Sequence, residues 1–213
     1  VELDGRLVKI LDDRFGATPS VQVHAGDVLK FDYSAVSDKY HTKLKVIGNV
    51  PYNISSPVVF HLLKHRTAIN NFTLMLQKEV VERLVGVPGT KSYGVPSILL
   101  QMYADVERLF DVGPSCFYPR PKVVSSVMQG FFRKRPLFEL KDEDLFVNLV
   151  RSSFARRRKM LLNNLKQASF LQDLPEQLIK ETLIQTGIDP TRRGETLSVE
   201  EFANLANNLK YRL

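Results

Sequence analysis

Four consecutive residues, Asn49-Val50-Pro51-Tyr52, have the types needed for chemistry on a planar amine. An amide oxygen and a nearby backbone carbonyl can accept hydrogen bonds from an NH2 group, and a tyrosine ring can stack on the attached base. Such a pair of acceptors would orient the nitrogen lone pair for attack. A turn after a strand, with Asn49 as a helix cap and Tyr52 in packing, is the alternative, and the tetrapeptide alone leaves both open.

Two acidic residues, Glu2 and Asp27, follow short apolar segments near the start of the chain. In a nucleoside-binding sheet, an acid at a strand end binds the ribose hydroxyls, and a later acid can accept from the adenine amine. A loop carboxylate or a helix cap is the alternative for each. None of the 11 glycines forms the Gly-x-Gly turn that should precede such an acid, and the chain does not begin with Met. We therefore expect an N-terminal piece to be absent.

Other reactive side chains give weaker signals. The histidines have no cysteine or carboxylate partners at metal-ligand spacing, which predicts no metal site. They are His24, His41, His61 and His65. The single cysteine, Cys116, cannot form an internal disulfide, so a reducing cytoplasmic setting is expected. Three serines lack the partners of a catalytic triad and are interpreted as turn or cap residues. They are Ser55, Ser56 and Ser125.

The positive charge is concentrated in two segments. The chain has 30 Lys+Arg and 23 Asp+Glu, a formal charge of +7. Residues 1–116 hold 13 basic and 12 acidic residues, 117–134 hold 4 and 0, and 135–213 hold 13 and 11. Basic residues without interleaved acid indicate a polyphosphate partner, although a solvated helix face is the alternative. The two segments without acid are 117–134 and 151–166. The candidate nucleic-acid-binding residues in them are Arg120, Lys122, Arg156, Arg157, Arg158 and Lys159.

The elements that must position these residues follow an α/β pattern. Apolar runs predict strands near 1–3, 21–24, 44–48, 71–76, 104–112 and 124–132, and amphipathic spacing predicts helices over 6–12, 57–65, 78–85 and 95–103. The strand 44–48 ends just before Asn49, where open α/β sheets bind their ligands. Only a proline-containing loop separates the last two strands, so we expect an antiparallel pair at the end of the sheet.

From residue 135 the pattern changes to helices alone. They are expected over about 142–154, 156–168, 175–186 and 199–209. Ser198-x-x-Glu201 forms a capping box for the last helix, and Gly187 ends the one before it. We place a domain boundary near 134–138, which gives domains of 1–134 and 135–213. No apolar run is long enough to span a membrane, so no membrane association is expected. We also expect a monomer.

Six segments together resemble the ribosomal RNA adenine dimethyltransferases, the bacterial KsgA family with its eukaryotic and archaeal relatives. The resemblance covers essentially the whole chain, and the order and spacing of the segments are more specific than any one of them. The segments are Val1-Glu2-Leu3-Asp4, Gly26-Asp27-Val28, Gly48 to Ser55, Leu76-Gln77-Lys78-Glu79-Val80, Phe117-x-Pro119-x-Pro121-Lys122-Val123-x-Ser125-x-Val127 and Phe154-x-x-Arg157-Arg158-Lys159.

The resemblance implies a Rossmann-like methyltransferase domain followed by a small helical domain that binds RNA. The implied reaction is transfer of methyl groups from S-adenosylmethionine to two adjacent adenosines of small-subunit (16S) ribosomal RNA, without a metal. Glu2 would bind the ribose hydroxyls, Asp27 the cofactor adenine, and Asn49 both the cofactor and the target amine. Tyr52 and Phe117 would stack on the two faces of the extruded base.

Two features depart from the family pattern. Val50 stands where leucine is usual, which is a mild change because its backbone carbonyl matters, and the N-terminal basic tail and glycine-rich loop are absent. We therefore expect these 213 residues to bind S-adenosylmethionine poorly. Two alternatives remain: a large-subunit RNA methyltransferase that confers antibiotic resistance, and a non-catalytic ribosome-assembly factor of the same fold.

Overall fold

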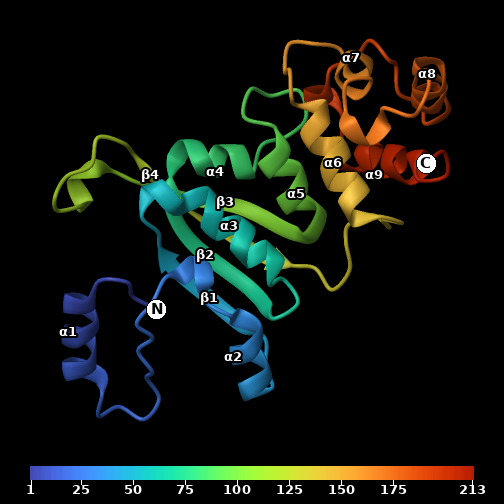
Figure 1. The fold of residues 1–213 in the computed structure, drawn as a ribbon. Helices are drawn as coiled ribbons and strands as arrows, with labels where there is room; N and C mark the ends of the chain where they lie inside the picture. Colours follow the sequence, from blue (N-terminus) through green and yellow to red (C-terminus); the bar gives the residue numbers. More distant parts are fainter.

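A four-stranded mixed sheet organises the first two thirds of the protein (Figure 1). The computed structural model describes all of residues 1–213. The strands are β1 (Leu44–Asn49), β2 (Ile69–Gln77), β3 (Ala104–Val112) and β4 (Ser125–Phe132), in the order β1-β2-β4-β3. β1 and β2 are parallel, whereas β4 is antiparallel to both β2 and β3. The predicted antiparallel pair at the end of the sheet is confirmed.

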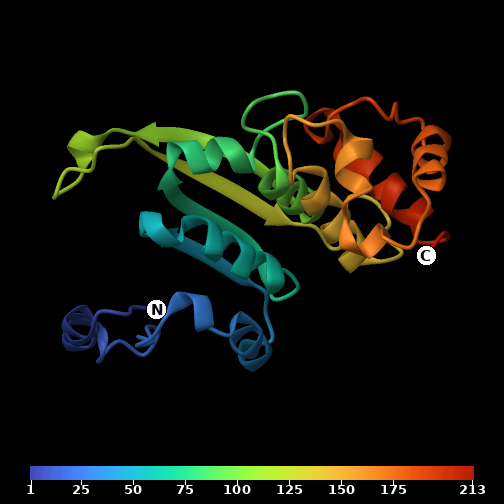
Figure 2. The ribbon, with the colours of Figure 1, turned by 45° about the horizontal axis from the view of Figure 1, so that its top comes forward.

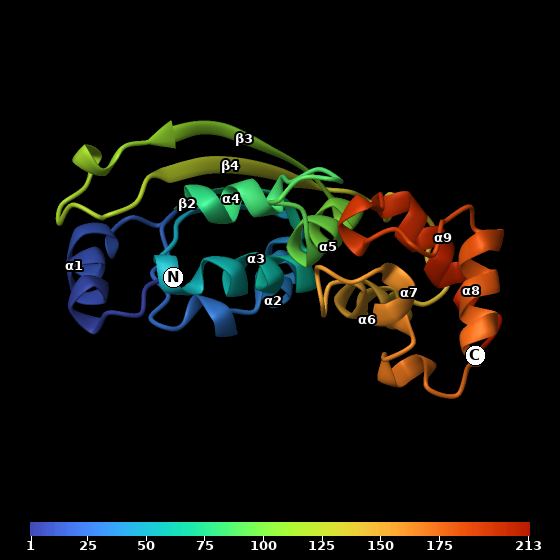
Figure 3. The same cartoon turned by 90° about the horizontal axis from the view of Figure 1, so that it is seen from above.

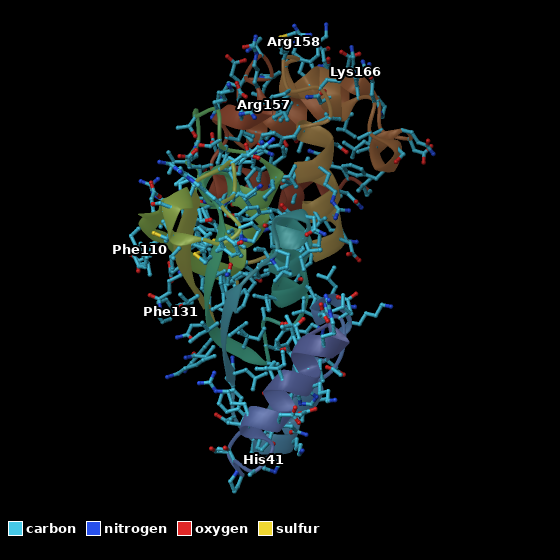
Figure 4. All side chains as sticks on the ribbon, turned by 90° about the vertical axis from the view of Figure 1, so that its left-hand side faces the viewer. His41, Phe110, Phe131, Arg157, Arg158 and Lys166 are labelled. Carbon is cyan, nitrogen blue, oxygen red and sulfur yellow. The ribbon has the colours of Figure 1, made fainter.

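Three helices cover one face of this sheet: α3 (Ser55–Lys64), α4 (Lys78–Leu84) and α5 (Val95–Tyr103) (Figures 1 and 2). Alternate residues of β2 and β4, such as Phe72, Leu74 and Met128, are buried beneath them. Gly130 belongs to the same face, and the ring of Phe72 lies where a side chain at Gly130 would be. On the opposite face, Phe110 and Phe131 are exposed (Figure 4).

The N-terminal segment does not extend the sheet, so the strands predicted near 1–3 and 21–24 are wrong. Only one parallel bridge forms, between Glu2 and Ala25, and neither residue pairs with β1. A strand needs a partner along several residues, whereas Asp4 ends the first segment by capping α1 (Gly5–Phe15). The next elements are the 3₁₀ turn η1 (Val28–Lys30) and α2 (Tyr33–Tyr40), a helix that the sequence pattern did not predict.

Aromatic and imidazole rings attach this segment to α3. His61 and His65 on α3 have ring centroids 4.8 Å apart, and Tyr33 contacts both. His61 Nε2 lies 2.8 Å from the Phe31 carbonyl oxygen, and His65 Nδ1 lies 3.0 Å from Ser34 Oγ. Burial, together with the nearby His61, lowers the pKa of His65 below its ordinary value. The two histidines therefore have a structural setting on the N-terminal side of α3.

The C-terminal third is helical, with α6 (Glu143–Ser153), α7 (Leu161–Leu165), α8 (Glu176–Gln185) and α9 (Val199–Leu209) (Figure 3). The capping box at Ser198 and Glu201 is confirmed, and Gly187 follows α8 with a φ of +75°. The helix predicted over 156–168 is wrong: residues 154–160 form a turn, and only α7 is helical. A helix over 156–159 would place four cations together with no acid one turn away to offset them. The turn is instead stabilised by the Asn164 amide, which donates to the Ser153 and Arg156 carbonyls.

One hydrophobic cluster joins the sheet and the C-terminal helices. It contains 39 buried residues and runs from Tyr33 to Leu209. A backbone hydrogen bond also crosses the expected boundary, from Leu137 N to the Met102 oxygen at 2.7 Å. The division near 134–138 stays a prediction. None of the helices combines the length and the apolar character needed to cross a membrane.

Candidate active site

The carboxyl end of β1 is the centre of the candidate site. Because β1 and β2 are parallel, their carboxyl ends meet at one edge of the sheet, and Asn49 is the last residue of β1. The pairing continues through Val50, whose N–H donates to the Met75 oxygen at 3.2 Å and whose side chain is buried. Burial of Val50 holds the backbone on both sides of it, while Asn49 itself is exposed.

A cavity of about 280 Å³ lies beside Asn49. Its walls include Tyr52, from the 3₁₀ turn η2 (Tyr52–Ile54), and Phe117, from the loop between β3 and β4. The Tyr52 hydroxyl lies 2.7 Å from Ser125 Oγ at the buried start of β4. The structure therefore brings together the three residues predicted to handle the target base, although they lie up to 68 positions apart along the chain (117 minus 49).

Polar contacts at the base of the β3–β4 loop fix its two ends. Lys78 Nζ donates to Asp111 Oδ2 at 2.8 Å, and Ser126 Oγ donates to Asp111 Oδ1 at 2.5 Å. The Lys78 backbone N–H also donates to the Val124 oxygen at 3.0 Å. The hydrogen bond from Lys78, followed by that from Ser126, lowers the pKa of Asp111. This network holds the loop that carries Phe117 against the carboxyl end of β2.

A second cavity, of about 470 Å³, lies on the N-terminal side of β1. Glu2, Asp27 and Asn49 all line it, together with apolar side chains such as Val28 and Phe31. Glu2 Oε1 accepts from Leu3 N and Asp4 N, and Asp27 Oδ1 accepts from Leu29 N. The second oxygen of each carboxylate has no hydrogen bond within the protein, so each can accept from a ligand.

Asn49, Val50 and Pro51 line both cavities. The end of β1 is therefore the shared wall between a crevice with two carboxylates and a pocket with two aromatic rings. Groups bound in the two cavities would therefore lie on either side of these residues. This arrangement suits transfer between two separately bound molecules, with Asn49 at the point of transfer.

The basic residues lie in two separate places. Arg120 and Lys122 are exposed on the β3–β4 loop, and Figures 1 and 3 show that this loop projects from the end of the molecule opposite α6–α9. Arg156, Arg158 and Lys159 are exposed on the turn between α6 and α7 and form no ion pair. Figure 4 shows Arg157, Arg158 and Lys166 at one end of the molecule. Their binding to RNA stays a prediction.

Arg157 differs from its neighbours because its guanidinium already has partners. Its Nε donates to Glu195 Oε2 at 2.5 Å, and one Nη donates to the Thr90 and Tyr93 carbonyls at 3.2 and 3.1 Å. These bonds join the turn after α6 to the loop before α5 and to the 3₁₀ turn η5 (Gly194–Thr196). Arg157 therefore connects the two halves of the protein, whatever contact it makes with RNA.

The remaining candidates take structural positions. No group of three or more His, Cys, Asp or Glu side chains is arranged to hold a metal ion. Ser125, interpreted from sequence as a turn or cap residue, instead pairs with Tyr52. The sequence reasoning also missed Lys78 and Asp111 as supports of the loop, and Tyr118 as a wall of the aromatic pocket. The motifs around Lys78 and Ser125 were the available signals.

Comparison with known proteins places this geometry among RNA methyltransferases. The family model described as ribosomal RNA adenine dimethylase matches residues 1–210. The chain is 44% identical over 212 residues to ribosomal RNA small subunit methyltransferase A of Syntrophus aciditrophicus, covering 99% of this chain and 75% of that protein. It is 46% identical over 210 residues to the protein of the same name from Geobacter sulfurreducens, covering 98% and 75%.

Two solved structures share the fold. A dimethyladenosine transferase from Plasmodium falciparum matches with a TM-score of 0.80 at 25% identity, covering 96% of this chain and 78% of that chain. The 23S rRNA methyltransferase ErmE matches with a TM-score of 0.71 at 22% identity, covering 98% and 80%. The second likeness concerns the fold alone. The predicted Rossmann-like methyltransferase fold with a helical C-terminal part is confirmed.

Proposed function

The chain belongs to the ribosomal RNA adenine dimethylase family, and we propose that it forms the site that methylates two adjacent adenosines of 16S ribosomal RNA in the small ribosomal subunit. The observation that carries the proposal is the pair of cavities that share Asn49, one with carboxylates and one with aromatic rings. The names of its relatives from Syntrophus and Geobacter support the small subunit as the source of the RNA.

The larger cavity fits S-adenosylmethionine. Its volume of about 470 Å³ is in the range of small-molecule sites, and it combines apolar walls with two carboxylates that have free oxygens. Glu2 would accept from the ribose hydroxyls and Asp27 from the adenine amine, while Val28 lines the same wall. When bound, S-adenosylmethionine supplies an electrophilic methyl group on a positively charged sulfur.

The smaller cavity would hold the target adenine after its extrusion from the RNA. Tyr52 and Phe117 provide aromatic faces, which replace the stacking that the base loses when it leaves its neighbours. The Asn49 side-chain oxygen and the backbone carbonyl oxygen of Val50 would accept hydrogen bonds from the adenine amine. Two acceptors on the amine hold its lone pair toward the neighbouring cavity, so the chain contributes mainly alignment.

Ser125 has a positioning role in this proposal. Its hydroxyl fixes that of Tyr52 at 2.7 Å, so the ring is held from both the β1 end and the β4 start. A ring fixed in this way loses less freedom when a base stacks on it. The fixed ring, and not the hydroxyl pair itself, is what touches the base.

The exposed basic residues would hold the RNA on either side of the site. Arg120 and Lys122 lie on the loop that carries Phe117, and Arg156, Arg158 and Lys159 lie on the turn after α6. Because these residues would neutralise several phosphates, the affinity for RNA should fall steeply as the salt concentration rises. We propose that a monomer contacts the RNA with both segments, because both belong to one chain with a continuous core.

The test is methylation of small subunits by the protein, followed by mapping of the modified nucleotides. We expect dimethylation of two adjacent adenosines in 16S RNA, and we expect Asn49→Ala to lower the rate by about 10²-fold or more because alignment is lost. Asn207→Ala is a matched control, since Asn207 lies on α9 and binds the Glu139 oxygen. Modification confined to large-subunit RNA, or an unchanged rate in Asn49→Ala, would contradict the proposal.

Cofactor binding is measured separately by calorimetry on the 213-residue chain. We expect Asp27→Asn to bind S-adenosylmethionine more weakly than the unmodified chain, because the Asp27 carboxylate lines the crevice. Equal affinities of the chain and of Asp27→Asn would contradict the role given to Asp27.

A further inference from the structure

Tyr118 is the most exposed aromatic residue of the protein and stands on the wall of the aromatic pocket. Its relative exposure is 101%, so its ring touches no other part of the chain. It nevertheless lines the same cavity as Asn49, Tyr52 and Phe117. A ring without packing partners adds little to the stability of the fold, and its position beside the candidate cavity leaves it available to a ligand bound there.

Other exposed tyrosines differ from Tyr118 in having a partner. The ring of Tyr211 is covered by Lys141 Nζ at 3.7 Å, and that of Tyr40 lies 5.2 Å from Lys39 Nζ. Tyr118 takes part in no cation–π contact and no ring pair within the protein. Its two faces are both free.

The local backbone directs Tyr118 and Phe117 to different bases. Phe117 has an extended conformation, with φ −123° and ψ 149°, and successive side chains of an extended segment point to opposite sides. Phe117 is half-buried, whereas Tyr118 is fully exposed. Two rings arranged in this way cannot both stack on one base. If Phe117 contacts the extruded base, the ring of Tyr118 is available to a neighbouring nucleotide.

We propose that Tyr118 stacks on the unpaired base next to the extruded adenosine and so determines which nucleotides are accepted there. This inference rests on the proposed function and concerns the same site. Extrusion of one base leaves its neighbour without a stacking partner on one side, and an aromatic side chain can take that place. Arg120 and Lys122 follow Tyr118 closely and would hold the adjoining phosphates.

A purine suits the position next to the extruded base best, because a purine offers a larger stacking surface to Tyr118 than a pyrimidine does. In the proposed reaction that neighbour is the second adenosine to be methylated. Tyr118 would therefore hold the second substrate base at the entrance while the first lies between Tyr52 and Phe117. Neither residue of the pair Arg120 and Lys122 can provide this selectivity, since contacts to phosphate carry no sequence information.

The chain contains no tryptophan, which gives a direct test. A Tyr118→Trp variant carries a single tryptophan at the site, and its emission reports stacking on a base. The probe is a short RNA hairpin whose loop holds two adjacent adenosines, and a second hairpin replaces one of them with an abasic residue. Binding is measured independently by fluorescence anisotropy of end-labelled RNA. Tyr211→Trp places the reporter on an exposed tyrosine far along the chain and is the matched control.

We expect the adenosine hairpin to quench the emission of Tyr118→Trp at saturation and to leave that of Tyr211→Trp unchanged. Tyr118→Ala should weaken binding by about 5- to 100-fold, the range for loss of one stacked base, whereas Tyr118→Phe should bind like the unmodified chain. The abasic hairpin should bind the unmodified chain more weakly by a similar factor, and Tyr118→Ala should not distinguish the two hairpins.

Full binding by anisotropy without quenching in Tyr118→Trp would overturn the inference and leave the proposed function standing. An equal loss of affinity for the abasic hairpin in the unmodified chain and in Tyr118→Ala would also overturn it, because the ring and the base would then act independently. If the unmodified chain bound neither hairpin, the RNA-binding part of the proposed function would fail, and the inference would fail with it.

Discussion

Replacing Arg157 with alanine separates two roles of the basic turn after α6. The Arg157 guanidinium donates to Glu195 and to two backbone carbonyls in the loop before α5, at 2.5 to 3.2 Å. Arg158, the next residue, is exposed and has no partner in the protein. We therefore expect Arg157→Ala to act mainly on folding stability and Arg158→Ala mainly on RNA binding.

The magnitude follows from the exposure of the groups involved. Hydrogen bonds to charged groups contribute about 1.5–3 kcal/mol when buried, and exposed ion pairs contribute about 0.2–1 kcal/mol. The side chains of Arg157 and Glu195 are 42% and 25% exposed, between these limits. We expect Arg157→Ala to lower the free energy of unfolding by about 1–2 kcal/mol. For a chain of this size that corresponds to a drop in Tm of about 2–8 °C.

Thermal unfolding followed by circular dichroism measures the first effect, and RNA affinity as a function of salt measures the second. Arg158→Ala should leave Tm unchanged and reduce the slope of log affinity against log salt by about 0.7–0.9, the value for one lost phosphate contact. Arg157→Ala should leave that slope unchanged. An unchanged Tm in Arg157→Ala, together with a reduced slope, would refute the structural role and assign Arg157 to the phosphate contacts.

Two further predictions concern the sheet and the histidine pair. Gly130→Ala should lower the free energy of unfolding by about 1–3 kcal/mol, because its methyl group would overlap the fully buried ring of Phe72. Denaturant unfolding measures this effect, with Gly5→Ala as the control. An unchanged denaturation midpoint in Gly130→Ala would contradict the prediction. Because the pKa of His65 is lowered in the folded protein, His65 takes up a proton at a higher pH in the unfolded chain than in the folded chain. The free energy of unfolding should therefore fall as the pH drops below about 6.5. Urea midpoints measured across that range should vary less in His65→Gln than in His41→Gln, and equal pH dependence of the two would contradict the reasoning.

The sequence pattern predicts the four sheet strands because each contains apolar residues in a run or in alternation. Of the four, β2 and β4 bury these residues beneath the helices, whereas β1 and β3 stay largely half-buried or exposed. It fails at residues 1–3 and 21–24, since a strand also requires a partner, and the partner of Glu2 is a single residue, Ala25. It fails again at 156–159, where the sequence alone does not reveal that the Asn164 amide will satisfy the carbonyls at the end of α6. In both places the outcome depends on contacts between segments.

The same distinction applies to the site. Asn49 is predictable because a polar residue at the carboxyl end of a parallel strand has a defined position in an α/β sheet. Ser125 is not predictable from its own surroundings, because its contact with Tyr52 spans 73 residues and depends on where β4 begins. Tyr118 is missed for the opposite reason: the pattern cannot distinguish an aromatic residue that packs in the core from one that is fully exposed.

The distribution of charge and the continuity of the core together determine how RNA can be held. Residues 1–116 are nearly neutral, with 13 basic and 12 acidic residues, so the crevice and the pocket add little general attraction for phosphate. The attraction would come from two separate segments, the projecting β3–β4 loop and the turn between α6 and α7 (Figure 3). One cluster of 39 buried residues includes side chains of both β4 and α6, so the elements that carry the two segments share a core. An RNA that contacted one segment would therefore meet the other on the same molecule, and an RNA whose phosphates match the distance between them would bind most tightly.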